Sequence, residues 1–496
     1  MNELSAMWKS GGKNMRNVTK LMFLNTLACP SYGWLMRLKP EEVRRPATLG
    51  EKFRIEQGME VGRRAREVYP NGILVDDKDM VSAIEKTKSL MNDLSVSVIF
   101  EGTFLVEGLA AKADILVRKD GGWHIIEVKS SVNDKKEYID DMAYTALVFN
   151  LSNHKLSTVS LMMISRDFRL GMDNNRLFVG IDRTKEVIER MLQFKTCYLQ
   201  IERVTRLPTK PRTELKLTCK SCSLFKDCAG KDIKNHIFDI PRLSQSKFED
   251  LLSHGIVRIE DIPDTFQLTE NQSKIKNCVK SSNFFVDNEL RNELNAIIWP
   301  AYYLDFETTQ TAIPTYPDMP PYASLVTQYS IHKCSAPGDV IDHFEFLSDE
   351  TKDDRWELVG HLTRDLGGEG SIITYSNFEK TTLNNLSKQF PDASGELNSL
   401  INRIVDLESI IRENFYHPDF HGSTSIKKTL PVLVPEMSYE GLEIRNGDDA
   451  MATFACLAQG KYGDSEVDAI KKHLLEYCKQ DTLAMVKLHQ QLVKYI

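Results

Sequence analysis

Two carboxylates and a lysine lie between Ala113 and Ser131 at a spacing that can support metal chemistry. This stretch reads as two short apolar strands joined by the turn Lys-Asp-Gly-Gly, which is typical of an antiparallel hairpin. Side chains alternate along a strand, so Glu127 and Lys129 share one face, and the hairpin can bring Asp114 beside Glu127. Such a set can hold a divalent cation and position a water, although an exposed sheet face with a salt bridge is an equally good interpretation.

A second acidic pair lies in the apolar stretch from Trp299 to Thr309. Asp305 and Glu307 stand two residues apart, so they share one face of the predicted strand. Two carboxylates in so apolar a strand would repel and desolvate each other unless a cation neutralised them. The strand therefore favours a metal site over acids placed for solubility.

Three further residues fit the same chemistry in the C-terminal part of the chain. Glu379 belongs to an Asn-Phe-Glu sequence that follows the predicted strand 371–375. Tyr477 and Asp481 are four residues apart near the C-terminus, so a helix would place the phenol and the carboxylate on one face.

Three cysteines follow the pattern Cys-x2-Cys-x5-Cys at Cys219, Cys222 and Cys228. A tetrahedral zinc ion or an iron–sulfur cluster requires four such ligands, so one must come from elsewhere. Cys29 is the candidate because it stands at a turn beside an apolar helix. The spacing by itself favours zinc over iron.

Composition limits the class of protein. At 496 residues the chain should form two or three domains, and its 42% apolar and 27% charged residues are ordinary for a globular protein. The net charge of −7 argues against a protein that coats nucleic acid indiscriminately, so binding would rely on local basic patches. Nine cysteines in a chain of this length do not suggest a secreted disulfide scaffold. We expect a cytoplasmic protein without a membrane span, since no apolar run approaches the necessary length.

The periodicity of the sequence changes along the chain. Residues 1–75 read as helical and locally basic, which we interpret as a solvated face rather than a surface for a phosphate backbone. Residues 235–297 read as a polar helical connector. The other predicted elements of the first half are strands within 96–129, a helix over 138–150, strands over 157–165 and 175–181, and a helix over 184–202.

From about residue 20 to 230, the early cysteine, the Asp…Glu-x-Lys hairpin and the later cysteine cluster together resemble the iron–sulfur members of the RecB-type PD-(D/E)XK nucleases. The resemblance implies that Asp114 and Glu127 bind metal and that Lys129 assists catalysis. It also implies a [4Fe–4S] cluster rather than zinc. The cluster ligands would be Cys29, Cys219, Cys222 and Cys228. The chain departs from the family in lacking a histidine at 58–62 and in placing Tyr144 near the position of a glutamine-containing helix.

From about residue 300 to the C-terminus, the chain resembles the DEDDy exonucleases of the RNase H-like fold, which include the YprB-type bacterial enzymes. The resemblance implies two Mg²⁺ or Mn²⁺ ions roughly 4 Å apart and a tyrosine, Tyr477, that orients the attacking water. Glu379 stands where the family usually has aspartate, and Asp406 could supply an additional acid. The implied metal ligands are Asp305, Glu307, Glu379 and Asp481.

The whole chain resembles a bacterial family that joins these two halves. The expected architecture is α/β throughout, and it comprises a restriction-endonuclease-like PD-(D/E)XK domain with its cluster over 1–234, a helical connector over 235–297 and an RNase H-like 3′–5′ exonuclease domain over 298–496.

The expected function is metal-dependent hydrolysis of DNA in repair or in defence against foreign DNA. The sequence contains no Gly-x4-Gly-Lys-Ser/Thr loop, so the enzyme would need a helicase partner or single-stranded ends. Two alternatives remain open at this point: an RNA-processing exonuclease, and a nucleic-acid-binding scaffold whose nuclease sites have decayed.

Overall fold

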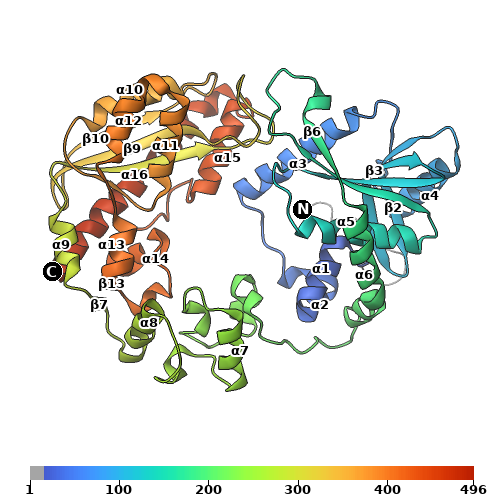
Figure 1. Ribbon diagram of the computed structural model, residues 1–496, viewed down its shortest axis with the longest axis horizontal. Helices are drawn as coiled ribbons and strands as arrows, with labels where there is room; N and C mark the ends of the chain where they lie inside the picture. Colours follow the sequence, from blue (N-terminus) through green and yellow to red (C-terminus); the bar gives the residue numbers. More distant parts are fainter. Residues whose placement is uncertain (1–15) are drawn as a thin grey trace. The chain divides into compact units, whose positions relative to one another are not determined.

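A computed structural model describes residues 16–496, which fold as a mixed α/β protein with two compact units (Figure 1). The first unit contains the described residues up to Glu214 together with Gln310–Ala323, and the second contains Leu215–Thr309 and Ser324–Ile496. The predicted boundaries of three domains stay a prediction, because the two compact units are defined by contacts between residues and not by the limits of independent domains. Residues 1–15 of the predicted N-terminal helical region lie outside the described residues.

The first unit is built on a six-stranded sheet, whose strands in spatial order are β1 (Ile73–Leu74), β2 (Val98–Val106), β3 (Leu109–Lys119), β4 (Gly122–Lys129), β5 (Leu156–Ile164) and β6 (Phe178–Asp182). β2, β3 and β4 are antiparallel neighbours, whereas β4 and β5 run parallel. A parallel pair needs a crossover, and α5 (Glu137–Leu151) supplies it. The predicted helix over 138–150 is thereby confirmed.

Helices cover both faces of this sheet, and they include α1 (Lys20–Ala28), α2 (Pro30–Leu38), α3 (Leu49–Glu67), α4 (Met80–Asn92) and α6 (Thr184–Val204). On one face, α1, α5 and α6 meet around Phe23, whose ring lies 4.9 Å from that of Tyr144 and 5.0 Å from that of Phe194. On the other face, Ala65 of α3 packs against β-strand residues that include Ile115 and Ile126. The sheet is therefore buried on both sides.

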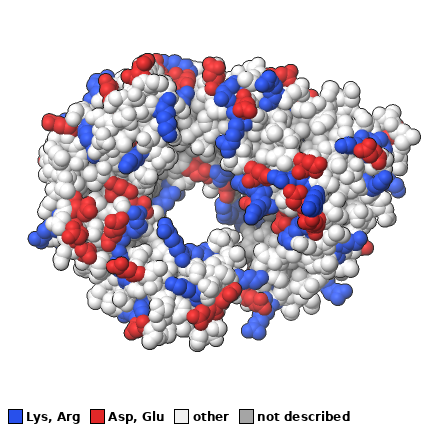
Figure 2. Space-filling model, viewed as in Figure 1, with Lys and Arg blue, Asp and Glu red and all other residues white. Residues whose placement is uncertain are grey.

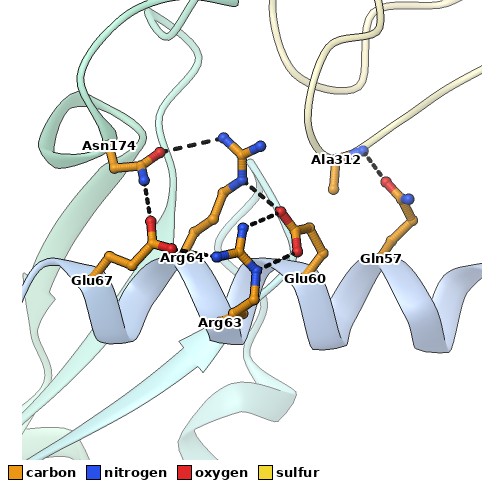
Figure 3. Close-up of polar contacts among 7 residues, drawn as sticks. All are labelled: Gln57, Glu60, Arg63, Arg64, Glu67, Asn174 and Ala312. Atoms are coloured by element: carbon orange, nitrogen blue, oxygen red, sulfur yellow. Dashed lines mark hydrogen bonds and ion pairs between the residues drawn. The ribbon is translucent and has the colours of Figure 1, made fainter. Parts of the chain in front are cut away.

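A segment from the C-terminal half of the sequence completes the first unit. Residues 310–323 pack there, and Ala312 is fully buried in a cluster with Val61 and Phe168. The backbone N–H of Ala312 donates to Gln57 Oε1 at 2.9 Å (Figure 3). The Tyr322 hydroxyl lies 2.8 Å from the Ser130 carbonyl oxygen and donates to it.

Two of the arginines on α3, Arg63 and Arg64, are paired with acids of the same helix. Arg63 forms ion pairs with Glu60 and Glu67, and Arg64 pairs with Glu60 (Figure 3). Basic and acidic side chains are likewise interspersed over the face seen in Figure 2. These pairs fit the interpretation of a solvated helical face, because a surface that follows phosphates would leave its cations exposed without acidic partners.

The second unit is built on a five-stranded sheet, whose strands in spatial order are β10 (Asp339–Leu347), β9 (Leu325–Ala336), β8 (Ala301–Thr309), β11 (Ile372–Thr374) and β12 (Ile404–Asp406). The first three are antiparallel neighbours, and β8, β11 and β12 run parallel. β8 is the central strand and is paired on both edges.

Each face of this second sheet packs against its own set of helices, namely α10 (Arg355–Leu366), α11 (Phe378–Gln389) and α12 (Ser394–Ile401) on one side and α16 (Asp464–Leu492) on the other (Figure 1). Because side chains alternate along β8, Leu304 and Phe306 face α10–α12, whereas Tyr303 packs with the residues of α16. Asp305 and Glu307 therefore share the side of Tyr303 and face the long C-terminal helix.

The predicted connector consists of short helices, α7 (Gln245–Ser253), α8 (Glu270–Ser281) and α9 (Glu289–Asn295), that share the large core of the second unit. A two-stranded antiparallel pair, β7 (Phe285–Val286) with β13 (Phe415–Tyr416), joins them to α13 (Leu407–Asn414). Within the described residues, no helix combines the length and the apolar character that crossing a bilayer requires.

Candidate metal-binding sites

The acids of β8 meet the C-terminal helix. Asp305, Glu307 and Asp481 each offer a carboxylate oxygen, and these oxygens all lie within 4.8 Å of one another. The three side chains are partly accessible, so an ion from solvent can reach them. Within the described residues, this is the group of His, Cys, Asp or Glu side chains whose spacing suits a single metal ion. The structure thus brings the two acids of the strand and Asp481 of the helix together, and their role as metal ligands stays a prediction.

Glu379 lies on the first turn of α11 and is 2% exposed. It shares a hydrogen bond with Asp305, and its Oε2 atom has no hydrogen-bond partner among the described residues. A buried carboxylate oxygen without a partner is costly unless a cation or water completes it. Glu379 therefore joins the acidic group on the side of Asp305.

Asp406 has a structural role at the end of β12. Its Oδ1 atom accepts hydrogen bonds from the backbone N–H groups of Ser376 and Ser409, both at 3.1 Å, and it caps α13. Asp406 also raises the pKa of Glu379, although burial is the larger cause. Asp406, the additional acid expected from the sequence, thus lies near the site, and its Oδ1 atom is occupied by hydrogen bonds from the backbone.

The acids of the second unit repel one another. Burial raises the pKa of both Asp305 and Glu307 well above the ordinary values, and Asp481 raises them further. Burial likewise raises the pKa of Glu379 to about 8 and that of Asp481 to about 6. Two unit charges 4.8 Å apart repel by roughly 3 kcal/mol at an effective dielectric constant of about 20. The full set cannot be ionised at neutral pH without added positive charge.

Phenols, rather than cations, contact this acidic group. Tyr477 lies one helical turn before Asp481 on the same helix, as the spacing predicted, and its hydroxyl also hydrogen-bonds to that carboxylate. Tyr439 also donates to Asp481, and sequence reasoning did not find it. Its sequence signal is absent, because Tyr439 lies 42 residues from its partner.

Two other residues beside the acids were also missed as contributors. The thiol of Cys478 lies 3.6 Å from Asp305 Oδ2 and is fully buried. Lys427, on α14 (Ile426–Leu433), lowers the pKa of Asp481 through its charge without forming an ion pair with it. The positive charge of Lys427 therefore acts on Asp481 through space and not through a direct contact.

The hairpin of the first unit has the predicted form. Asp120 and Gly121 both have positive φ angles, 48° and 67°, which are the angles of the two-residue turn that suits twisted strands. The β3–β4 ladder ends at Ile115 and Ile126. Beyond it, the Val128 N–H donates to Asp114 Oδ2 at 2.7 Å, so Asp114 takes the place of a backbone acceptor where the strands separate.

Glu127 lies at the centre of an ion-pair group on this sheet. It is 2% exposed, and its Oε1 atom accepts from Lys129 Nζ at 2.9 Å and from Lys20 Nζ at 2.6 Å. Lys129 also pairs with Asp141 of α5. Lys20, the first residue of α1, is a site residue that the sequence analysis missed, because 107 residues separate it from Glu127.

A third acid, Glu101, lies near this pair. It has a φ of 57° and lies on β2 opposite Asp114, because the β2–β3 register pairs Phe100 with Ile115 and Gly102 with Ala113 without a shift. Its charge contributes to raising the pKa of Asp114. The pairing of β2 with β3 thus brings a third carboxylate beside the predicted acid pair.

The two predicted metal ligands of the first unit titrate very differently. Burial and the charge of Glu127 raise the pKa of Asp114 to about 7. Burial would also raise the pKa of Glu127, but Lys20 and Lys129 outweigh it and lower the value to about 2. Glu127 is thus held as a carboxylate by lysines that belong to the fold.

The cysteine cluster lies in a compact loop of the second unit. The backbone N–H groups of residues 219, 222, 225 and 228 each donate to the carbonyl three residues earlier, at 2.9–3.1 Å. No disulfide joins the cysteines of the described chain. Cys29 precedes α2 in the first unit, where the Ser31 hydroxyl donates to the Pro211 carbonyl at 2.7 Å. The chain that leads to Cys219 therefore passes the helix that follows Cys29.

Comparison with known families gives one match. Residues 302–425 match the model of a domain of unknown function, DUF2779. The match covers about a quarter of the chain and includes Asp305, Glu307 and Glu379, but it ends before Tyr477 and Asp481. A comparison with curated proteins finds no significant match.

Proposed function

We propose that this protein is a nuclease that hydrolyses DNA phosphodiester bonds with divalent metal ions and trims DNA from a 3′ end. The observation that carries the proposal is the convergence of Asp305, Glu307 and Asp481, whose oxygens lie within 4.8 Å. The unpartnered oxygen of buried Glu379 supports it, since it fits a ligand that waits for a cation. The resemblance to the RNase H-like DEDDy exonucleases supplies the substrate class and the polarity.

The donor set suits hard cations. Carboxylate oxygens are the ligands that Mg²⁺ and Mn²⁺ prefer, and Asp305, Glu307, Glu379 and Asp481 would hold them. Bound Mg²⁺ or Mn²⁺ supplies an activated water and stabilises the leaving oxygen in phosphodiester hydrolysis. Tyr477 and Tyr439 orient the Asp481 carboxylate through their hydroxyls, and Tyr477 also lies where it can direct a water.

We extend the proposal to the first unit, where Asp114 and Glu127 form a second nuclease centre with Lys129. The buried Glu127 Oε2 atom has no hydrogen-bond partner among the described residues, so it can accept a divalent ion. Lys129 contacts Glu127 and its side chain is partly exposed, so its ammonium group can approach a phosphate. This centre follows the restriction-endonuclease-like arrangement that the sequence resemblance implies.

A [4Fe–4S] cluster on Cys29, Cys219, Cys222 and Cys228 is part of the proposal. The cysteines of the described chain form no disulfide, and the loop from 216 to 228 is compact. Thiolate ligands suit iron–sulfur clusters, and such a cluster would join the two ends of the N-terminal nuclease domain. The protein would work in a reducing compartment, such as the cytoplasm, with a helicase or a single-stranded end as the source of accessible DNA.

The test is a cleavage assay with Mg²⁺ or Mn²⁺ on 5′-labelled single-stranded DNA and on RNA of the same sequence. We expect a ladder that shortens from the 3′ end on DNA, and its loss in Asp305→Ala. Glu396→Gln removes an exposed acid of the same unit from α12 and serves as the matched control. Internal cuts that persist in Asp305→Ala and vanish in Lys129→Ala would report the first centre.

The assay also separates the alternatives. Degradation of RNA with DNA left intact would identify an RNA-processing exonuclease. Binding of the DNA or the RNA without cleavage, in the parent and in both variants, would identify a scaffold with inactive sites. Equal cleavage by Asp305→Ala and the parent would refute the assigned centre.

The cluster has its own test, which is independent of activity. Protein purified without oxygen should be brown and should bleach with dithionite, and it should contain about four iron atoms for each chain. Cys222→Ser should lose the colour. A colourless protein with stoichiometric zinc would overturn the iron assignment and restore the zinc interpretation.

A further inference from the structure

Lys20 stands at a position where a helix disfavours a cation. It is the first residue of α1, and the first turn of that helix contains no acidic residue. The N-terminal end of a helix carries partial positive charge, so a lysine there is destabilised unless an acid neutralises it. Glu127 does so: Lys20 Nζ lies 2.6 Å from Glu127 Oε1, and the Lys20 side chain is 27% exposed.

The backbone just before Lys20 is fixed in place. The Val18 N–H donates to the Gly108 carbonyl at 2.8 Å, and the Ala110 N–H donates to the Val18 carbonyl at 2.9 Å. The buried Tyr144 hydroxyl donates to the same Val18 carbonyl at 2.6 Å. Lys20 therefore reaches Glu127 from a segment that is hydrogen-bonded to the start of β3, and not from a loose chain end.

The two carboxylate oxygens of Glu127 have different surroundings. Oε1 is bonded to both Lys20 and Lys129, whereas Oε2 is buried and has no hydrogen-bond partner within residues 16–496. One oxygen of Asp114 is already bonded to the Val128 N–H. Asp114 Oδ1 and Glu127 Oε2 are therefore left for a metal, and the Lys20 ammonium group contacts the other oxygen of Glu127, Oε1.

We propose that Lys20 is the resident counter-ion of the N-terminal centre: it occupies a cation position on Glu127 and restricts this centre to a single divalent ion. The inference rests on the metal centre proposed for the first unit. Lys20 thus acts as a positioning residue, because it fixes which oxygen of Glu127 faces the ion and lowers the affinity for the ion by its own charge. The other charged groups around it are Asp114, Glu101, Lys129 and Asp141.

The test measures Mn²⁺ binding by electron paramagnetic resonance on the full chain, with the C-terminal centre removed by Asp305→Ala and Asp481→Ala. We expect one Mn²⁺ for each chain in this background. Lys20→Met should bind Mn²⁺ at least about tenfold more tightly, because a positive charge beside the ion is removed. Lys20→Arg should restore the parental affinity, and Lys86→Met, which removes a lysine paired with Asp76 and Asp77, should leave it unchanged.

The outcomes are distinguishable. Equal or weaker Mn²⁺ binding in Lys20→Met overturns the role of Lys20 while the proposed nuclease survives. Two Mn²⁺ ions in the background chain overturn the single-ion claim without any change at Lys20, so the inference stays testable if Lys20→Met does not fold. Absence of Mn²⁺ in every variant removes the N-terminal metal centre together with the inference, whereas 3′ trimming by the unaltered chain reports on the C-terminal centre alone.

Discussion

The two acidic centres of this protein manage their charge in opposite ways. In the first unit, Glu127 is bonded to Lys20 and Lys129, so its charge is offset by side chains of the fold. In the second unit, the acids contact phenols, a thiol and one another, and no ion pair to them occurs among the described residues. In the first centre Glu127 is thus neutralised by lysines of the fold, whereas the acids of the second centre require protons or metal ions.

The pKa values express the same difference. Glu127 has its pKa lowered to about 2, because two lysines outweigh its burial. Glu379 has its pKa raised to about 8, because burial and nearby acids act together. The buried acids of the two centres therefore differ in what balances their charge, and the lysines of the first unit separate the two cases.

The largest expected effect comes from removing a ligand of the second centre. Asp305→Asn should lower the rate of 3′ trimming by about a thousandfold, which corresponds to roughly 4 kcal/mol in the barrier. The reason is that Asp305 interacts with the carboxylates of both Glu379 and Asp481. Single-turnover kinetics on 5′-labelled DNA would measure it, and a rate within threefold of the parent would contradict the assignment.

Metal ions should stabilise the second unit more than the first. At a free Mg²⁺ or Mn²⁺ concentration a hundred times the Kd, binding to one site adds about 2.7 kcal/mol of unfolding free energy. Thermal unfolding should show a rise in Tm that is largely lost in the Asp305→Ala, Asp481→Ala double variant. The double variant should also unfold at a higher Tm than the parent without metal, because repulsion has been removed. An unchanged metal effect in the double variant would break the contrast between the centres.

The stability of the metal-free protein should depend on pH in a direction set by the second centre. Glu379 titrates near 4.5 when unfolded and near 8 when folded, so its contribution is complete below pH 4.5 and is lost as the pH rises through 8. Asp481 and Asp114 act in the same direction, with folded pKa values of about 6 and 7. Glu127 acts in the opposite direction, but its stabilisation is lost only as the pH falls through about 2.

The expected result is a fall in Tm between pH 5 and pH 8.5 in the presence of EDTA, because each unit by which folding raises a pKa corresponds to about 1.4 kcal/mol of stability that is lost as the pH rises. Each kcal/mol corresponds to about 2–4 °C for units of this size. Glu379→Gln should flatten the dependence, and saturating Mg²⁺ should reverse it. A Tm that rises over this range would mean that the acids are neutralised by protein groups in both centres.

The smallest expected effect concerns the second phenol. Tyr439→Phe removes a hydrogen bond to the Asp481 carboxylate, which is worth about 1.5–3 kcal/mol when the acceptor is charged and less when it is partly protonated. We expect kcat for trimming to fall about tenfold with KM unchanged, because Tyr439 orients the Asp481 carboxylate and does not bind the DNA. Tyr462→Phe removes a phenol that contacts Thr453, away from the acids, and serves as the control.

Local patterns predicted the parts of these centres that lie close together in the sequence. The alternation of β8, the Asp-Gly turn of the hairpin and the four-residue spacing of Tyr477 and Asp481 each follow from one element, so the sequence alone predicted them. Glu379 was identified through a family resemblance and not through periodicity. Its approach to Asp305 depends on how α11 packs on the sheet.

The missed residues share a different property. Lys20 is 107 residues from Glu127, and Tyr439 is 42 residues from Asp481. Neither stands in a pattern that distinguishes it from an ordinary surface lysine or core tyrosine, because only the tertiary fold brings each one to its acid. Glu101 was also missed, because its place opposite Asp114 depends on the pairing of β2 with β3 and no motif marks it.

The segment 310–323 has a consequence for dividing this protein. It begins three residues after Glu307, yet Ala312 fills a pocket lined by Val61, Phe168 and other apolar residues of the first unit. An N-terminal fragment made alone would expose those apolar side chains, and a C-terminal fragment would carry an orphan loop. Separately expressed halves should therefore regain solubility only when a synthetic peptide of these fourteen residues is supplied, so dividing the gene between the two units is a harder evolutionary step than the order of the sequence suggests.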